Sequence, residues 1–130
     1  MLQSSIPYVR SMGFIRTKVY VGAADLKNVR EELFLADTGS WYMVLTPKLA
    51  EELSLKPVGR VKLTLADKRV VEADVAAVYV KLLEREAILT SVIMDTPEPL
   101  LGISTMEALG LELDPTTGDV RATKPALLLV

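Results

Sequence analysis

Apolar and polar residues alternate along much of the chain, and this pattern predicts an all-β protein of short strands and tight turns. The alternation is clear over residues 14–21 and 60–66, where Val61, Leu63 and Leu65 are expected to face inward. A longer strand region over residues 69–83 is expected to pair with residues 87–94. Further strands are predicted over residues 29–36, 41–45 and 111–113, and from residue 120 onward.

Two short helices interrupt the strands. Thr46 followed by Pro47 is typical of a helix start, with threonine as N-cap and proline in the first turn; Pro57 and Gly59 are expected to end this helix. Ser104 and Glu107 have the spacing of a capping box, which predicts a second helix that stops at Gly110.

The turns are also readable from the sequence. Asp67-Lys68 is expected to form a hairpin turn, and residues 84–86 a second one. Residues 114–119 superficially suggest a calcium loop, but they lack the EF-hand spacing and its final glutamate, so a plain turn is expected.

Length and composition indicate one domain, residues 1–130, large enough to bury most of its apolar surface. Half of the residues are hydrophobic and the mean hydropathy is +0.31, yet no apolar run approaches the roughly eighteen residues of a membrane span. We therefore expect no membrane partner, and we expect the apolar surplus to cover a subunit interface. The first residues lack the pattern of a signal peptide, which favours a cytoplasmic location. The net charge of −2 with scattered basic residues argues against nucleic acid as a partner.

The absence of cysteine and histidine restricts the chemistry. It excludes disulfides, thiol nucleophiles, serine–histidine triads and most zinc sites, so aspartate and glutamate remain as the candidate catalytic groups, with no metal or organic cofactor expected. Gln3 and Asn28 are the only side-chain amides, and their scarcity favours a thermophilic source.

One stretch combines an acid with buried strands. The apolar residues 33–36 lead into Asp37-Thr38-Gly39-Ser40, and the apolar residues 41–45 follow. A second apolar segment, Pro99-Leu100-Leu101-Gly102-Ile103, repeats the design without the acid. Alone, Asp-Thr-Gly is typical of a structural turn, because aspartate readily hydrogen-bonds the backbone two residues on. The apolar flanks and the second segment favour a functional site.

These two segments resemble the motifs of retroviral-like aspartic proteases, and residues 100–115 are similar to the C-terminal signature of the small prokaryotic single-domain group. The resemblance implies a closed acid-protease barrel and a homodimeric endopeptidase that cleaves a peptide or an unfolded protein. Asp37 would be its catalytic residue, one from each subunit. Support at the site would come from Thr38, Gly39, Ser40, Leu101 and Gly102. Thr38 would lock the two loops together through its hydroxyl.

The chain departs from the retroviral pattern at two places. Trp41 stands where those proteins usually carry an acid, and Ile103 stands where they carry its arginine partner, so an apolar contact is expected to replace the ion pair. The flap over residues 65–71 contains no glycine, which predicts a stiffer tip. The resemblance places substrate-binding residues at the flap and rim, at Trp41, Ala66, Asp67, Lys68 and Arg69.

Two other readings remain open. The chain could be a non-catalytic module of the same fold that binds extended peptides or serves only to dimerise. Alternatively, it is a plain β-barrel interaction protein in which Asp37 is a turn residue. If the enzyme reading holds, the apolar residues 126–130 are expected to contribute to the dimer interface.

Overall fold

The computed structural model describes residues 15–114 and 116–123. These residues are mostly β-strands with two short helices, as the alternating pattern predicts. The strands are β1 (Ile15–Ala23), β2 (Arg30–Ala36), β3 (Met43–Leu45), β4 (Gly59–Thr64), β5 (Val70–Leu82), β6 (Arg85–Ile93), β7 (Leu100–Leu101), β8 (Leu111–Leu113) and β9 (Val120–Ala122). The helices are α2 (Pro47–Glu52) and α3 (Ile103–Ala108).

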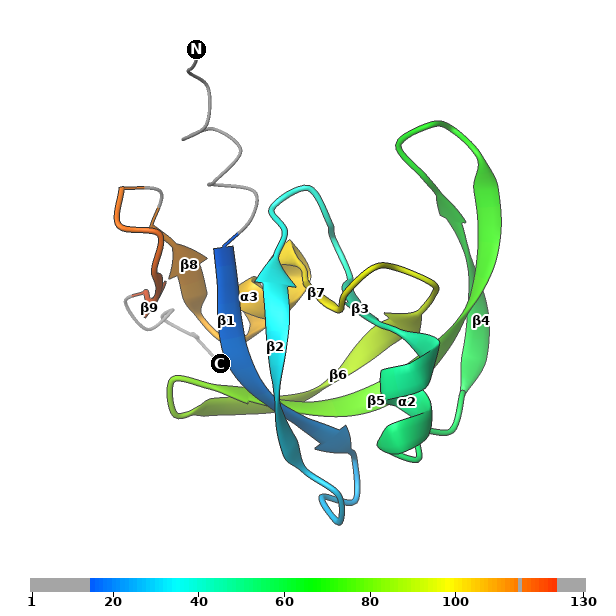
Figure 1. Ribbon diagram of the computed structural model, residues 1–130, viewed down its shortest axis with the longest axis horizontal. Helices are drawn as coiled ribbons and strands as arrows, with labels where there is room; N and C mark the ends of the chain where they lie inside the picture. Colours follow the sequence, from blue (N-terminus) through cyan, green and yellow to red (C-terminus); the bar gives the residue numbers. More distant parts are fainter. Residues whose placement is uncertain (1–14, 115, 124–130) are drawn as a thin grey trace, which may run out of the picture.

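Six strands close into a ring, which confirms the predicted barrel. The large sheet has the order β1-β2-β7-β3-β6-β5-β4, and β1 pairs in addition with β5 (Figure 1). The closing pair is antiparallel and sets Val21 opposite Val80. Strand β4 lies outside the ring and pairs with β5. The second sheet consists of the β8–β9 hairpin.

The core fills the inside of this ring. Strand alternation sends Val19 and Val21 of β1, and Val78 and Val80 of β5, into the interior, where each is fully buried. Phe34, Met43, Leu45, Leu53 and Leu101 are also fully buried. Burial of this apolar surface is the main stabilising contribution, about 25 cal/mol per Å² of area removed from water.

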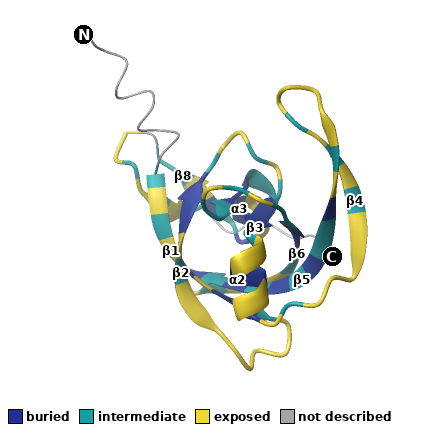
Figure 2. Ribbon diagram, turned by 45° about the vertical axis from the view of Figure 1, so that its right-hand side comes forward, coloured by how far each residue is buried: buried dark blue, intermediate teal, exposed yellow. Residues whose placement is uncertain are grey.

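The β4–β5 hairpin projects beyond the ring and is largely exposed (Figures 1 and 2). In its first half, Val61, Leu63 and Leu65 are half-buried while the residues between them are exposed, as the alternation predicts. The turn spans residues 65–69 and is closed by hydrogen bonds from Lys68 N–H to Leu65 O and from Leu65 N–H to Arg69 O, both 2.8 Å. Lys68 has a φ of 71°, a conformation that side chains other than glycine adopt at a cost.

Three local predictions are wrong in detail. The turn between β5 and β6 consists of Leu83 and Glu84, both with positive φ, so Arg85 belongs to β6 rather than to the turn. The first helix ends at Glu52, before Pro57. Strand β3 begins at Met43, not at Trp41.

The predicted capping box is also wrong. Helix α3 begins at Ile103 with Gly102 as N-cap, and no side chain caps it. Ser104 lies inside the helix, and its hydroxyl donates to the carbonyl oxygen of Trp41. The Thr46 cap of α2 is confirmed, since its hydroxyl accepts from Leu49 N–H at 3.1 Å.

The two helices occupy related places in the fold. Each has six residues, each follows a short inner strand, and each is followed by a residue with positive φ, Ser54 after α2 and Gly110 after α3. Leu49 and Ala50 of α2 correspond to Thr105 and Met106 of α3 as the buried pair. The internal resemblance between the two halves therefore extends to their helices.

The C-terminal part forms the β8–β9 hairpin. A hydrogen bond from Gly118 N–H to Asp114 O at 2.8 Å closes its turn, which agrees with the turn predicted there. Among the described residues, no cluster of three or more acidic side chains could hold a metal ion. The expected interface residues 126–130 lie outside the described residues.

Ser91 in β6 is an expected weak point of the core. Its side chain is fully buried, and its Oγ has no hydrogen-bond partner in the described part of the chain. A buried hydroxyl without a partner costs about 1–3 kcal/mol. We expect Ser91→Ala to leave the free energy of unfolding unchanged or to raise it by about 1 kcal/mol.

Urea unfolding measures this effect, with Thr46→Ala as the control. Thr46 caps α2, so its replacement is expected to lower the free energy of unfolding by about 1 kcal/mol. An equal loss in both variants would mean that the Ser91 hydroxyl is satisfied.

Candidate active site

Asp37 follows the buried end of β2. Phe34, Leu35 and Ala36 are buried, and β2 runs parallel to β7 with Ala36 opposite Leu101. The backbone N–H of Asp37 continues this ladder and donates to Leu101 O at 3.1 Å. The second apolar segment of the sequence therefore fixes where the acid leaves the barrel.

The loop that carries Asp37, residues 37–42, is organised by the acid itself. Gly39 N–H donates to Asp37 Oδ1 at 2.9 Å, and Ser40 N–H donates to Asp37 O at 3.1 Å. Ser40 Oγ donates to Tyr42 O at 2.8 Å. Asp37 is half-buried, and its Oδ2 accepts no hydrogen bond from the described residues. One carboxylate oxygen thus orients the side chain while the other remains available for chemistry.

Gly102 lets α3 lie directly against this loop. Ile103 N–H donates to Ser40 O at 2.8 Å, and Ser104 N–H donates to Trp41 O at 2.9 Å. A Cβ atom on residue 102 would lie 2.2 Å from Tyr42 O, so only glycine permits this approach. These contacts also explain why β3 starts late, because the loop carbonyls are bonded to α3.

A cleft of about 460 Å³ lies beside the loop, between it and the β4–β5 hairpin. None of the described residues that line it carries a charged side chain, and Asp37 itself is not among them. The lining residues are Gly39, Ser40, Trp41, Tyr42, Val44, Leu63, Thr64, Leu65, Ala66, Val92, Met94, Thr96 and Leu100. Such an apolar cleft suits uncharged side chains of a ligand.

The structure brings some of the predicted site residues together and leaves others apart. Trp41 and Ala66 line the cleft from opposite sides, and Trp41 is 58% exposed. Asp67, Lys68 and Arg69 are exposed at the hairpin tip and do not line it; Arg69 Nε pairs with Asp67 Oδ2 at 2.6 Å. Leu101 is fully buried behind the loop, whereas Thr38 is exposed.

Sequence reasoning missed several lining residues. Val92 lies at the far end of β6, Met94 directly after it, and Leu100 in β7, so their proximity depends on the pairing of β3 with both strands. For these lining residues, only the alternation of apolar and polar residues over 60–66 was informative, since it placed Leu63 and Leu65 on the same face of the hairpin. Trp41 and Ile103 are the two positions that depart from the retroviral pattern. There, backbone hydrogen bonds from Ile103 and Ser104 join the start of α3 to the Asp37 loop.

A surface ion pair holds the segment that leads into β7. Arg16 Nε and Nη2 donate to the two carboxylate oxygens of Glu98, both at 2.8 Å. Hydrogen bonding to Arg16 keeps the pKa of Glu98 below its ordinary value of 4.5. In the β8–β9 turn, hydrogen bonds from Thr116, aided by the charge of Arg121, lower the pKa of Asp114 in the same way.

These shifts predict acid sensitivity. A carboxyl group whose pKa is lower in the folded than in the unfolded state contributes stability at higher pH, and that contribution is lost as the pH falls through the folded-state pKa. We expect the midpoint of thermal unfolding to fall as the pH drops below about 4.5, and to fall less steeply in Glu98→Gln.

Thermal melts between neutral pH and pH 3 test this, with Glu84→Gln as control. The Glu84 side chain is 91% exposed and lies 3.9 Å from Lys81 Nζ. Removing its charge should therefore not change how steeply the unfolding midpoint falls with pH. Identical slopes for Glu98→Gln and the wild type would contradict the prediction.

Comparison with known proteins agrees with this geometry. The family described as "Aspartyl protease" matches residues 23–113, which span the Asp37 loop, the hairpin and α3. Among solved structures, the EIAV protease complexed with the inhibitor HBY-793 is similar, with a TM-score of 0.62 and 22% sequence identity; the match covers 78% of this chain and 92% of that one. A search of curated proteins found no match.

At that identity the structural likeness establishes the fold, and the family match covers most of the chain. Within the described residues, no helix has the length and hydropathy needed to cross a membrane. The chain belongs to the aspartyl protease family and has a retropepsin-like fold.

Proposed function

We propose that this protein is an aspartic endopeptidase that acts as a homodimer, with Asp37 of each subunit as the catalytic residue. The observation that carries the proposal is the half-buried Asp37 carboxylate, which Gly39 N–H orients at 2.9 Å. Its other oxygen accepts no hydrogen bond from the described residues, and it lies beside a cleft whose described lining carries no charge. The Asp-Thr-Gly motif occurs once in the chain. Because this chemistry needs two carboxylates, the second must come from another copy.

The two carboxylates would hold a single proton between them. With oxygens about 3 Å apart and an effective dielectric constant near 20, two negative charges repel by roughly 5 kcal/mol. Aspartic-protease dyads are known to lose their two protons in well-separated steps for this reason. Over a mildly acidic range the pair therefore contains both an acid and a base, and both properties belong to the pair.

The reaction follows from this shared proton. The ionised Asp37 takes a proton from a water molecule, whose oxygen attacks the peptide carbonyl carbon. The protonated Asp37 of the partner hydrogen-bonds the carbonyl oxygen as negative charge develops there, and a proton then passes to the leaving nitrogen as the C–N bond breaks. No cofactor is needed for these steps.

The cleft suggests how the substrate binds. An extended peptide would lie between the Asp37 loop and the β4–β5 hairpin, with uncharged side chains in the cleft. Ala66 and Trp41 would contact it from either side, while Asp67, Lys68 and Arg69 would form the tip that closes over it. Thr38, which is exposed, would bond the partner's loop through its hydroxyl. Peptides and unfolded proteins present such extended segments.

We expect dimer formation and peptide cleavage to depend on each other. We expect sedimentation at micromolar concentration to show a dimer, and we expect an unfolded protein to be cleaved at mildly acidic pH. The activity per chain should fall when the protein is diluted below the dimer dissociation constant, because each chain carries half of the site.

The control for this experiment is Asp37→Ala in the same assay. A folded monomer that cleaves at full rate would contradict the shared site. A dimer that binds peptides without cleaving them, in wild type and variant alike, would favour the non-catalytic module of the same fold.

A further inference from the structure

Helix α3 depends on partners outside itself at both ends. It has only six residues, no side-chain N-cap, no acid in its first turn and no base in its last turn. A helix this short has little stability of its own. Its first N–H groups and last carbonyl groups lack partners within the helix, so other parts of the fold must supply them.

The Asp37 loop supplies the partners at the start of α3. Ile103 N–H and Ser104 N–H donate to Ser40 O and Trp41 O at 2.8 and 2.9 Å. Helix α2 differs here, because the hydroxyl of its own Thr46 provides the N-terminal cap. The direction of α3 and the position of the loop that carries the acid are therefore linked by two backbone hydrogen bonds.

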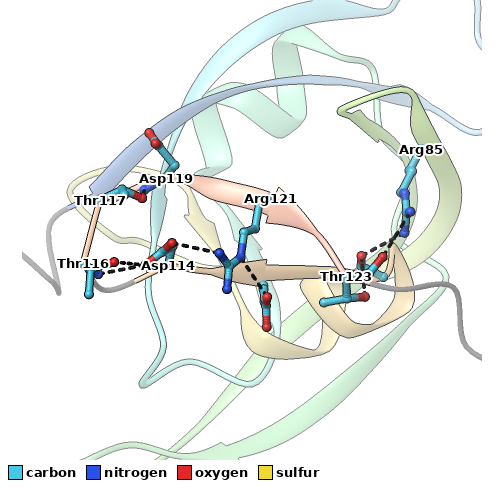
Figure 3. Close-up of polar contacts among 9 residues, drawn as sticks. Arg85, Asp114, Thr116, Thr117, Asp119, Arg121 and Thr123 are labelled. Carbon is cyan, nitrogen blue, oxygen red and sulfur yellow. Dashed lines mark hydrogen bonds and ion pairs between the residues drawn. The ribbon is translucent and has the colours of Figure 1, made fainter.

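Arg85 supplies the partners at the other end. Its Nη1 donates to Leu109 O at 3.1 Å and to Gly110 O at 2.8 Å, and its Nη2 reaches Thr123 O at 3.5 Å (Figure 3). Arg85 is half-buried. A cation at a helix C-terminus also interacts favourably with the helix dipole.

The space for this guanidinium is built into the chain. Gly110 has a φ of +66°, and a Cβ atom there would lie 2.4 Å from Arg85 Nη1. Thr123 holds the same carbonyl from the other side, since its N–H and its Oγ each donate to Gly110 O at 2.9 Å. Arg85 thus ties the start of β6 to the end of α3 and to the residue after β9.

We propose that Arg85 is a positioning residue for the Asp37 loop, acting through α3. The chain of contacts runs from the Arg85 guanidinium to Leu109 O and Gly110 O, along α3, and from Ile103 and Ser104 to the carbonyls of Ser40 and Trp41. The hydrogen bonds of Arg85 go to the end of α3 and to Thr123 rather than to Asp37, and Arg85 is not among the cleft-lining residues. Its consequence for catalysis rests on the proposed function, whereas its effect on the loop does not.

Hydrogen exchange tests the structural half of this proposal, whether or not the protein is active. In Arg85→Met, the Ile103 and Ser104 amides at the far end of α3 should exchange about tenfold faster than in the wild type. Arg85→Lys should recover part of this protection, because an ammonium group can still donate to one carbonyl.

Two control variants distinguish faster exchange at Ile103 and Ser104 from a general loss of stability. Asn28→Ala removes the Nδ2 donor to Glu52 O, at 2.9 Å, which serves the end of α2 in the same way. Arg121→Met removes the ion pairs to Glu112 and Asp114 within the β8–β9 hairpin (Figure 3). Neither variant should speed exchange at Ile103 or Ser104. Faster exchange in Arg85→Met confined to Gly110 and β8–β9 would overturn the proposal.

Kinetics test the catalytic half. At a temperature where the variant is fully folded and dimeric, Arg85→Met should lower kcat by about tenfold to a hundredfold with little change in KM, because the two carboxylates are misaligned. Asn28→Ala should retain the wild-type kcat. An unchanged kcat in Arg85→Met would overturn the positioning role. An inactive wild type would refute the proposed function and leave the exchange result to decide the role of Arg85.

Discussion

Replacing Asp37 with asparagine is expected to abolish peptide hydrolysis while the dimer remains assembled. The ionised carboxylate acts as general base in the proposed mechanism, a contribution of about 10²–10⁴-fold to the rate, and asparagine cannot accept the proton. Stability near neutral pH should stay the same or rise, because the variant has no like-charge repulsion across the two-fold axis. Its carbonyl oxygen can still accept the hydrogen bond from Gly39 N–H.

The opposite change in stability is expected if Asp37 is only a turn residue. The carboxylate would then contribute a charge-assisted hydrogen bond, worth about 1.5–3 kcal/mol, and asparagine would weaken it. Asp25→Asn calibrates that effect, because Asp25 Oδ1 accepts from Lys27 N–H at 3.0 Å in an exposed turn. Thermal melts of both variants at neutral pH give the comparison. Equal destabilisation by Asp37→Asn and Asp25→Asn, with no peptidase activity in the wild type, would favour the hypothesis that Asp37 is only a turn residue.

Gly102→Ala is the second substitution for which we expect a large effect. The added Cβ would lie 2.2 Å from Tyr42 O, 2.6 Å from Tyr42 C and 2.7 Å from Trp41 O. All three are backbone atoms, so no side-chain rotation relieves the overlap, and α3 must separate from the Asp37 loop. We expect a loss of about 3 kcal/mol or more in the free energy of unfolding. Activity should fall with it.

Gly59→Ala is the matched control. A Cβ there would make an ordinary contact of 3.6 Å with Val75 Cγ2, so the variant should unfold within about 0.5 kcal/mol of the wild type. Urea unfolding followed by circular dichroism measures both. Similar stability of the two alanine variants would show that α3 can withdraw from the loop at little cost.

The sequence predicted what depends on local pattern. Alternation at Val61 and Leu63 placed one face of β4 correctly, because the two-residue period of a strand is a property of the strand alone. Thr46 was identified as a cap for a similar reason, since its partner is three residues away. The barrel itself was implied by the family resemblance rather than by any single strand.

The sequence-based predictions were wrong where a residue's hydrogen-bond partners lie far away in the sequence. Ser104 has the spacing of a cap, yet the loop carbonyl of Trp41 takes its hydroxyl, and Gly102 becomes the N-cap. Arg85 was assigned to a hairpin turn because its three carbonyl partners lie 24 to 38 residues away. The cleft walls at Val92 and Met94 likewise depend on strand pairing that a linear pattern does not encode. The catalytic role of Asp37 stays a prediction.

The outlying position of β4 has a consequence for a protein that would handle unfolded chains. Within residues 15–114 and 116–123, strand β4 pairs only with β5, so its other edge presents backbone groups that no described strand pairs with. Its exposed positions include Arg60 and Lys62, and charged residues of this kind discourage a second strand from joining an open edge. The same hairpin that borders the cleft thus carries protection against aggregating with the polypeptides it would encounter.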